Sequence, residues 1–209
     1  MPQDGCPNWL EWVRELQAIS QTGLAFSQTP YDTQRYHRLM EIAAEVLAAC
    51  TSLPKSEVLQ GFSVQPGYAT VKVDVRGAVI RDGKILLVQE RRDQKWCMPG
   101  GWADVGDLPS EMVAREVLEE SGLEVRPVKV IGVFDANRGP RPLECYHAYK
   151  IVFLCQILGG QPRGSDETAA ADFFDFADLP PLSTDRTDAR HLAEVQAHIQ
   201  SPGRSAAFD

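Results

Sequence analysis

Hydrophobic and polar positions recur with two different periods along the chain, and the change of period divides it. Over the first sixty residues apolar side chains recur three and four positions apart, which is the spacing of one helical face. The clearest run is Trp9, Trp12, Val13, Leu16 and Ile19. The pattern predicts a helix from an N-cap at Asn8 to a stop at Gly23, a second from Asp32 to Cys50, and a short third starting at Pro54. We expect residues 1–60 to form a small helical domain whose apolar faces pack on another domain or a second subunit.

Gly, Ser and Pro residues between positions 61 and 67 predict a linker, after which the period falls to two. Val71, Val73 and Val75 alternate with polar residues, and Asp82-Gly83 predicts a hairpin turn. Helical character returns between Ser110 and Ser121. Further strands are expected over 125–134, 146–158 and 171–176, with a closing helix over 187–199 and a frayed tail after 202. We therefore expect an α/β (α+β) domain over residues 67–205.

Composition narrows the class of protein. The 209 residues carry a formal net charge of -8, which argues against an electrostatic nucleic-acid binder and a polybasic membrane-surface protein. No apolar run approaches the roughly 20 residues that span a bilayer, and the N-terminus lacks the features of a signal peptide. The five cysteines form no CxxC pair, so we expect mostly buried, reduced thiols in a cytoplasmic protein. Cys145 and Cys155 would form a redox pair only if their strands were adjacent.

Three glutamates are the most informative feature. Glu116, Glu119 and Glu120 stand at i, i+3 and i+4 of the predicted helix and so share one face, where their like charges repel. A hard divalent cation such as Mg²⁺ would offset that repulsion. An isolated acidic trio is more often a solvated face. Here, however, a Pro99-Gly100-Gly101 loop precedes the helix, Arg115 can orient a carboxylate, and Gly122 follows.

This joint pattern resembles the motif of the Nudix hydrolases, GX5EX7REUXEEXGU, in which U is a bulky apolar residue. Gly101 takes its first position, and the later positions match in register: Arg115, Glu116, Val117, Glu119, Glu120, Gly122 and Leu123. Asp107 stands where the family has Glu, a carboxylate that mainly supports the loop. The resemblance extends from about residue 67 to the C-terminus. It implies the Nudix fold, an α/β/α sandwich with a mixed sheet.

The N-terminal segment resembles the helical extension of one Nudix subgroup. The similar stretches are Trp9–Trp12, Gln17–Ile19, Gly23–Phe26, and Tyr31-Asp32 followed by Arg35-Tyr36. That subgroup includes CDP-choline pyrophosphatases and proteins labelled ADP-ribose pyrophosphatases, and its extension helps to form a dimer. The resemblance therefore implies a homodimer through the N-terminal helices.

The resemblance also implies an activity: hydrolysis of the diphosphate bond of a nucleoside diphosphate linked to another group, with Mg²⁺ or its substitute Mn²⁺. It implies metal ligands at Gly101, Glu116, Glu119 and Glu120, and catalytic roles for Glu119, Glu120 and Arg115. The candidate general base is Glu167, in the loop 164–168, which is equally typical of an exposed loop acid.

Several assignments stay open. Arg91 or Arg92 is expected to hold a substrate phosphate, although surface ion pairs are the alternative. Trp96 is expected to pack under the loop rather than stack on a base. Pro140 and Pro142 lie only near the proline that marks many ADP-ribose enzymes, so CDP-choline and ADP-ribose both remain candidates.

Two other functions compete. The first is a pyrophosphatase that removes damaged nucleoside triphosphates. The second is a non-catalytic nucleotide-sensing regulator, which would lose motif carboxylates or carry a basic DNA-binding domain; neither feature is seen in the sequence. A plain dimerisation scaffold would leave the acidic helix unexplained.

Overall fold

The computed structural model describes residues 8–63, 67–104, 106–137 and 147–209. The chain forms two compact units, one of residues 1–71 with 137–147 and one of residues 72–136 with 148–209. We call them the helical unit and the sheet unit. Within the described ranges, no helix is both long enough and apolar enough to cross a membrane.

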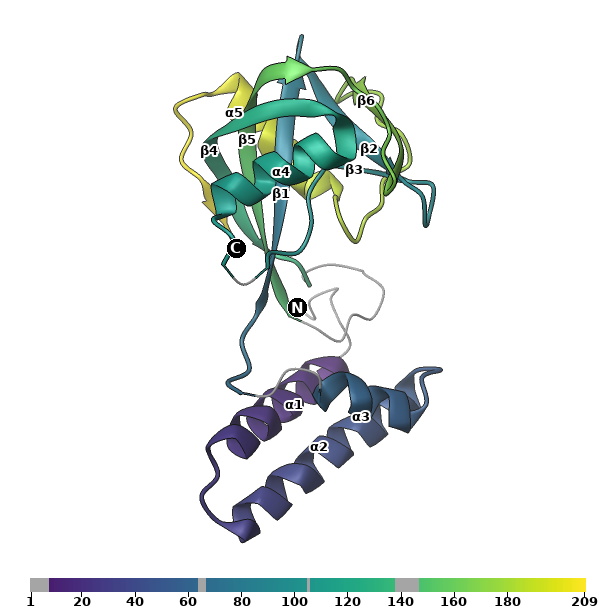
Figure 1. The fold of residues 1–209 in the computed structure, drawn as a ribbon, viewed down its shortest axis with the longest axis vertical. Helices are drawn as coiled ribbons and strands as arrows, with labels where there is room; N and C mark the ends of the chain where they lie inside the picture. Colours follow the sequence, from purple (N-terminus) through teal and green to yellow (C-terminus); the bar gives the residue numbers. More distant parts are fainter. Residues whose placement is uncertain (1–7, 64–66, 105, 138–146) are drawn as a thin grey trace. The chain divides into compact units, whose positions relative to one another are not determined.

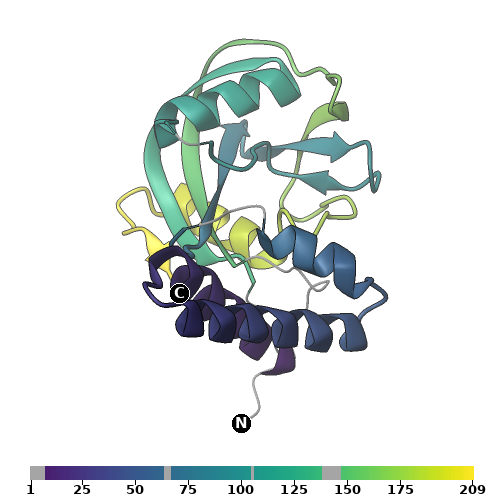
Figure 2. The same cartoon turned by 60° about the horizontal axis from the view of Figure 1, so that its bottom comes forward.

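The helical unit contains α1 (Asn8–Phe26), α2 (Pro30–Cys50) and α3 (Lys55–Ser63). Helices α1 and α2 lie side by side (Figures 1 and 2). The three predicted helices are confirmed, and their apolar stripes meet in one core. Its buried members are Leu10, Val13, Met40, Ala43, Ala44, Leu47, Val58 and Phe62.

Three predicted helix ends were wrong. Helix α1 continues past Gly23 to Phe26, and Gly23 instead gives room to the Tyr36 ring of α2, which a side chain there would strike. Thr29 caps α2 in place of Asp32, because its hydroxyl accepts the Asp32 N–H at 3.1 Å. The third helix extends to residue 63, into the predicted linker, whose residues 64–66 lie outside the described ranges.

The sheet unit consists of strands β1 (Lys72–Arg81), β2 (Lys84–Glu90), β3 (Trp96–Cys97), β4 (Leu123–Asp135), β5 (Ala148–Gly160), β6 (Thr168–Phe174) and β7 (Ala207–Phe208), with helices α4 (Pro109–Ser121) and α5 (Ala189–Gln200). The strand order is β3-β2-β1-β5-β4-β7, with β6 on β2. Strand β1 pairs in parallel with β5 and antiparallel with β2, so the sheet is mixed.

Helices α4 and α5 cover opposite faces of this sheet (Figure 1). Alternate residues of β1 enter two different cores, because successive side chains of a strand point to opposite faces. Val75 and Val79 pack in the core that contains α4, whereas Ala78 packs in the core that contains α5. The predicted α/β/α sandwich with a mixed sheet is confirmed.

The first hairpin and the C-terminal end of the sheet unit were both predicted from the sequence. The predicted hairpin turn is confirmed, with Asp82 and Gly83 at φ 52° and 77°. The predicted frayed tail is wrong. Strand β7 pairs with β4, and Asp209 forms an ion pair with Arg190 at 3.0 Å. The chain end is thus fixed by a backbone ladder and by charge.

The thiols partly follow expectation. Cys97 and Cys155 are buried free cysteines, whereas Cys50 is exposed. Cys6 and Cys145, and with them the alternative redox pair, lie outside the described residues.

Candidate functional site

Helix α4 supplies the acidic face of the site. Its Met112, Val113 and Val117 are buried in the core, and this orientation fixes where the glutamates lie. Glu120 is buried at 6% exposure, Glu116 is half-buried and Glu119 is exposed. The helix ends as predicted at Gly122, whose left-handed φ of 73° suits a residue without a Cβ.

The glycine loop lies across strand β1. The Val75 N–H donates to the Gly101 carbonyl at 2.9 Å, and the Gly77 N–H donates to the Pro99 carbonyl at 2.8 Å. Gly100 has a φ of +141°, and a Cβ there would strike the Val75 carbonyl. The loop can approach the strand this closely only because position 100 is glycine.

Two of the glutamates meet this loop. The Gly100 N–H donates to the Glu120 carboxylate at 2.8 Å, and the Thr168 hydroxyl donates to the Glu120 backbone carbonyl at 2.6 Å. The Glu116 carboxylate lies against Gly101, where an added Cβ would come within 2.9 Å of its Oε2. The helix and the loop therefore form one surface, on which the carboxylates of α4 lie beside backbone groups of the glycine loop.

Burial is the main electrostatic cost at this surface. It raises the pKa of Glu120 to about 7, against the opposing effects of the Arg76 charge and the Gly100 hydrogen bond. Burial, followed by the charge of Glu119, also raises the pKa of Glu116. Both shifts mean that the positive charges and hydrogen bonds of the protein do not fully offset the cost of burying the ionised carboxylates.

The donor chemistry fits a hard divalent cation, because carboxylate and carbonyl oxygens are the ligands that Mg²⁺ prefers. A positive ion at this surface would stabilise the ionised carboxylates and would lower the two pKa values that burial raises. Across the described residues, however, no group of three acidic, histidine or cysteine side chains is already arranged to hold a metal ion. The structure brings Glu116 and Glu120 to the loop, while Glu119 stays exposed.

The Arg115 guanidinium and the Asp107 carboxylate form a bidentate ion pair, with nitrogen–oxygen distances of 3.0 and 3.2 Å. Arg115 also lies 3.7 Å from the Glu116 carboxylate. Asp107 in turn accepts the Asp104 N–H at 3.2 Å. The shorter acid at position 107 thus still links the loop to the helix.

The candidates outside the helix take different positions. Glu167 is exposed, yet close enough to Glu116 for its charge to contribute to the raised pKa of that carboxyl. Arg91 and Arg92 are both exposed, and Arg91 donates to the Ser165 carbonyl at 2.8 Å and so contacts the loop that carries Glu167. Trp96 packs edge-to-face on Phe174 of β6 at 4.7 Å, and its packing under the glycine loop stays a prediction.

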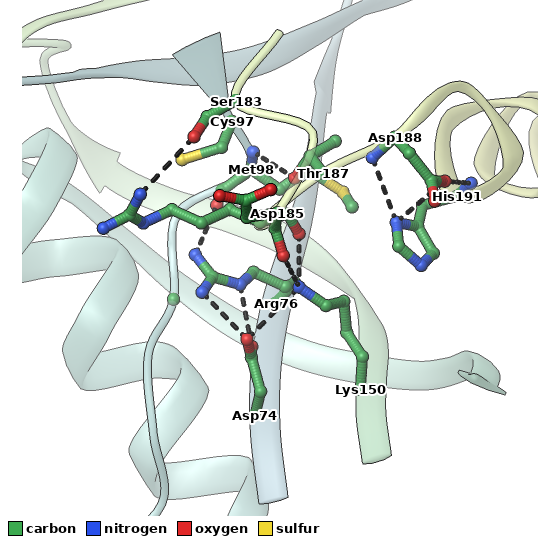
Figure 3. A network of polar contacts seen from close by, with 12 residues as sticks. Asp74, Arg76, Cys97, Met98, Lys150, Ser183, Asp185, Thr187, Asp188 and His191 are labelled. Atoms are coloured by element: carbon green, nitrogen blue, oxygen red, sulfur yellow. Dashed lines mark hydrogen bonds and ion pairs between the residues drawn. The ribbon is translucent and has the colours of Figure 1, made fainter. Parts of the chain in front are cut away.

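A buried group of three charges was missed by sequence reasoning (Figure 3). Arg76 donates to both Asp74 oxygens at 2.8 and 3.0 Å and to the Met98 carbonyl at 3.2 Å. Lys150, fully buried, lies 3.2 Å from Asp74. The sequence feature that could have revealed this group is the pair of opposite charges at Asp74 and Arg76, two positions apart and so on one face of the strand.

Comparison with known proteins places both units. Residues 71–195 match the model of the NUDIX domain. Residues 7–62 match a model described as "UDP-X-like, N-terminal oligomerisation domain".

Relatives in sequence carry related names. The chain is 38% identical over 201 residues to a Bacillus subtilis (strain 168) protein named "Putative ADP-ribose pyrophosphatase YjhB", covering 96% of this chain and 97% of that protein. It is 35% identical over 122 residues to an ADP-ribose pyrophosphatase of Methanocaldococcus jannaschii, covering 56% and 70%.

Two solved structures are also similar. A UDP-X diphosphatase superposes with a TM-score of 0.62 at 31% identity, covering 97% of this chain and 98% of that one. An ADP-ribose pyrophosphatase from Streptococcus suis gives a TM-score of 0.59 at 35% identity, covering 67% and 100%.

Proposed function

Because this chain belongs to the Nudix family and is a Nudix pyrophosphohydrolase, we propose that it cleaves the diphosphate bond of a nucleoside diphosphate linked to another group. The products are a nucleoside monophosphate and the phosphorylated second group. The observation that carries this proposal is the docking of Glu120 on the Gly100 N–H at 2.8 Å, with Glu116 against Gly101. We keep residues 1–60 and 67–205 as the proposed domains.

Glu116, Glu119, Glu120 and the Gly101 carbonyl are the proposed ligands of Mg²⁺, or of Mn²⁺ in its place. When bound, the ion would neutralise diphosphate charge and lower the pKa of a water molecule.

The chain's own residues hold the reacting groups. The Gly100 N–H and the Thr168 hydroxyl fix Glu120, while Arg115, held by Asp107, orients Glu116. We assign Glu167 as the base that takes a proton from the attacking water. The water oxygen forms a new bond to one phosphorus, the bridging P–O bond breaks, and the bridging oxygen leaves with the other phosphate.

ADP-ribose is the proposed substrate, with CDP-choline and UDP-linked sugars as the nearest competitors. Support for ADP-ribose comes from the name of the relative that matches over nearly the whole chain, and support for a UDP-linked group from the full-length structural neighbour. The general reaction is the same for all three, because the leaving group carries the second phosphate in each case.

A coupled assay tests the activity. Purified protein with Mg²⁺ is mixed separately with ADP-ribose, CDP-choline, UDP-glucose and dATP. A phosphatase releases phosphate from the monoesters formed from the first three, whereas dATP cleavage is measured as dAMP by chromatography because a phosphatase attacks dATP itself. Turnover of ADP-ribose above the other compounds supports the proposal. Preferred cleavage of dATP would favour a triphosphate-cleaving enzyme instead, and no turnover across the panel would refute the proposed substrate class.

We also propose that the enzyme is a homodimer through helix α1. Trp12, Ile19 and Phe26 are seven residues apart and form one exposed stripe, with 60%, 46% and 66% of their surfaces accessible. The match of residues 7–62 to an oligomerisation domain supports a second copy as the occupant.

Light scattering tests the dimer. The double substitution Trp12→Glu with Phe26→Glu should halve the mass in solution, while Tyr68→Glu, exposed outside these helices, should not. An unchanged dimer in the double variant would exclude this stripe. A cytoplasmic location is proposed from the buried free thiols Cys97 and Cys155.

A further inference from the structure

Residues Ser183–Thr187 bring an arginine to the edge of the site, and sequence reasoning gave this segment no role. We propose that Arg186 binds the diphosphate of the substrate. This inference rests on the proposed function, because it names a substrate contact for the same reaction.

Five hydrogen bonds hold the segment, to residues at the start of the glycine loop and to Lys150 on β5. The Ser183 N–H donates to the Trp96 carbonyl at 2.8 Å, and the Met98 N–H donates to the Thr187 hydroxyl at 2.9 Å. The Ser183 hydroxyl donates to Asp93 at 2.7 Å. Lys150 on β5 donates to the carbonyl of Asp185 (Figure 3) and to that of Arg186. The backbone that carries Arg186 is therefore held beside the loop, although Arg186 lies 86 residues after Gly100 in the sequence.

The buried lysine is the costly part of this arrangement. An ammonium group taken out of water loses several kcal/mol of hydration, which its partners must offset. Lys150 is fully buried, and its ammonium lies between Asp74 and the two carbonyls of the segment. Lys150 thus acts as a positioning residue for the segment.

The Arg186 side chain points to the acidic side of the site. Its Nε lies 3.0 Å from Glu90 Oε1, which also accepts the Cys97 thiol at 3.4 Å, and Cys97 is the residue before Met98 of the loop. Glu90 is also close enough to Glu120 for its charge to affect that carboxyl. Arg186, Glu90 and Glu120 therefore form a series of neighbouring charges.

The guanidinium keeps donors for a ligand. Its Nε is directed at Glu90 and its Nη1 lies 3.4 Å from the Ser183 hydroxyl, while 30% of the side chain stays exposed. A guanidinium presents five donors in a planar fork that matches phosphate oxygens. Arg186 can thus contact a diphosphate without breaking its pair with Glu90.

The neighbouring arginines are engaged differently. Arg76 is buried at 4% exposure and donates two hydrogen bonds to Asp74 and one to the Met98 carbonyl. Arg115 is held by Asp107. Arg91 donates to the Ser165 carbonyl. Arg186 combines partial exposure with a backbone fixed at the glycine loop.

Calorimetric binding of methylenediphosphonate, an uncleavable diphosphate without a nucleoside, tests the proposal in the presence of Mg²⁺. Arg186→Gln should weaken binding by about tenfold or more, the loss expected for a hydrogen bond between charged groups. Arg186→Lys keeps the charge opposite Glu90 but loses the planar fork of donors. Its affinity for the diphosphonate should lie between those of wild type and Arg186→Gln. The matched control Arg126→Gln removes an exposed arginine whose partner is Gln156 on β5, and binding should stay unchanged.

The kinetic readout is the division between KM and kcat. With the best substrate of the panel, Arg186→Gln should raise KM by about the same factor as it weakens the diphosphonate, because both losses come from one contact. Equal diphosphonate affinity in wild type and both Arg186 variants, or no binding to wild type, would overturn the proposal. If only the proposed substrate class is wrong, the result will be different. The panel will then show no turnover, while the diphosphonate will still bind more weakly to the Arg186 variants than to wild type.

Discussion

Replacing Glu120 by Gln should stabilise the metal-free protein at pH 8 while it removes the activity. Burial raises the pKa of this carboxyl from 4.5 to about 7. A shift of that size corresponds to roughly 3 kcal/mol of unfavourable free energy when the group must ionise in the folded state. The Gln amide needs no ionisation, and its oxygen can still accept the Gly100 N–H. The neutral bond is weaker by about 1 kcal/mol, so the net gain is about 2 kcal/mol.

The sign of the pH dependence is fixed by the direction of the shift. Below pH 4.5 the carboxyl is protonated in the folded and unfolded states alike and contributes nothing. As the pH rises towards 7, the unfolded state releases its proton first, so the folded state binds more protons and loses stability. The penalty is complete above pH 7. The advantage of Gln over Glu should therefore be present at pH 8 and largely lost near pH 4.5.

Scanning calorimetry in EDTA at pH 8 and at pH 4.5 measures this difference. At pH 8 the melting temperature of Glu120→Gln should exceed that of wild type by roughly 5 °C or more. The control Glu119→Gln makes the same chemical change on the exposed neighbour and should have little effect on melting. A gain in melting temperature from Glu120→Gln that is equal at both pH values, or no gain at pH 8, would refute the argument that burial of an ionised carboxylate limits stability.

The remaining predictions concern two glycines and the C-terminal end of the chain, and each is measured as a change in melting temperature. Gly61→Ala is the common control, because an added methyl group at that position meets open space. Gly122→Ala should destabilise the sheet unit by about 1–2 kcal/mol, because φ is +73°; unchanged melting would show that the helix end can adjust. Gly23→Ala should destabilise the helical unit, because its methyl would strike the Tyr36 ring; a melting gain like that of a free helical site would contradict this packing. Deletion of residues 203–209 should lower the melting temperature through loss of β7, and an unaffected transition would mean that the tail adds nothing to stability.

Much of the fold could be predicted because hydrophobic period and turn chemistry are local. The Asp82-Gly83 turn needs two residues that tolerate positive φ, and the sequence contains such a pair between two apolar runs. Gly122 ends α4 for the same local reason. At Gly23 the identical residue type has a different cause, close approach by α2, and no local signal separates a stop from a contact. Helix ends were therefore predicted where the backbone decides them and missed where tertiary packing does.

The candidate site divides in the same way. The spacing of Glu116, Glu119 and Glu120 places them on one helix face, but only the fold decides that Glu120 is buried and Glu119 exposed. Asp74 and Arg76 stand at polar positions of an alternating strand, which is the pattern of a solvated face. In the structure that face is covered and both charges are buried. Alternation shows which residues share a face and carries no information on what covers it.

The glycine loop is organised by residues distant in the sequence as well as by its motif. Its Met98 is bonded twice: the N–H to Thr187, 89 residues later, and the carbonyl to Arg76, 22 residues earlier. Both partners connect to Lys150, through the segment that carries Thr187 and through Asp74. A displaced Lys150 would thus disturb both hydrogen bonds of Met98, which lies two residues before Gly100, whose N–H holds Glu120. The buried charges of Asp74, Arg76 and Lys150 are therefore connected, through Met98, to the loop that carries the proposed metal ligand Gly101.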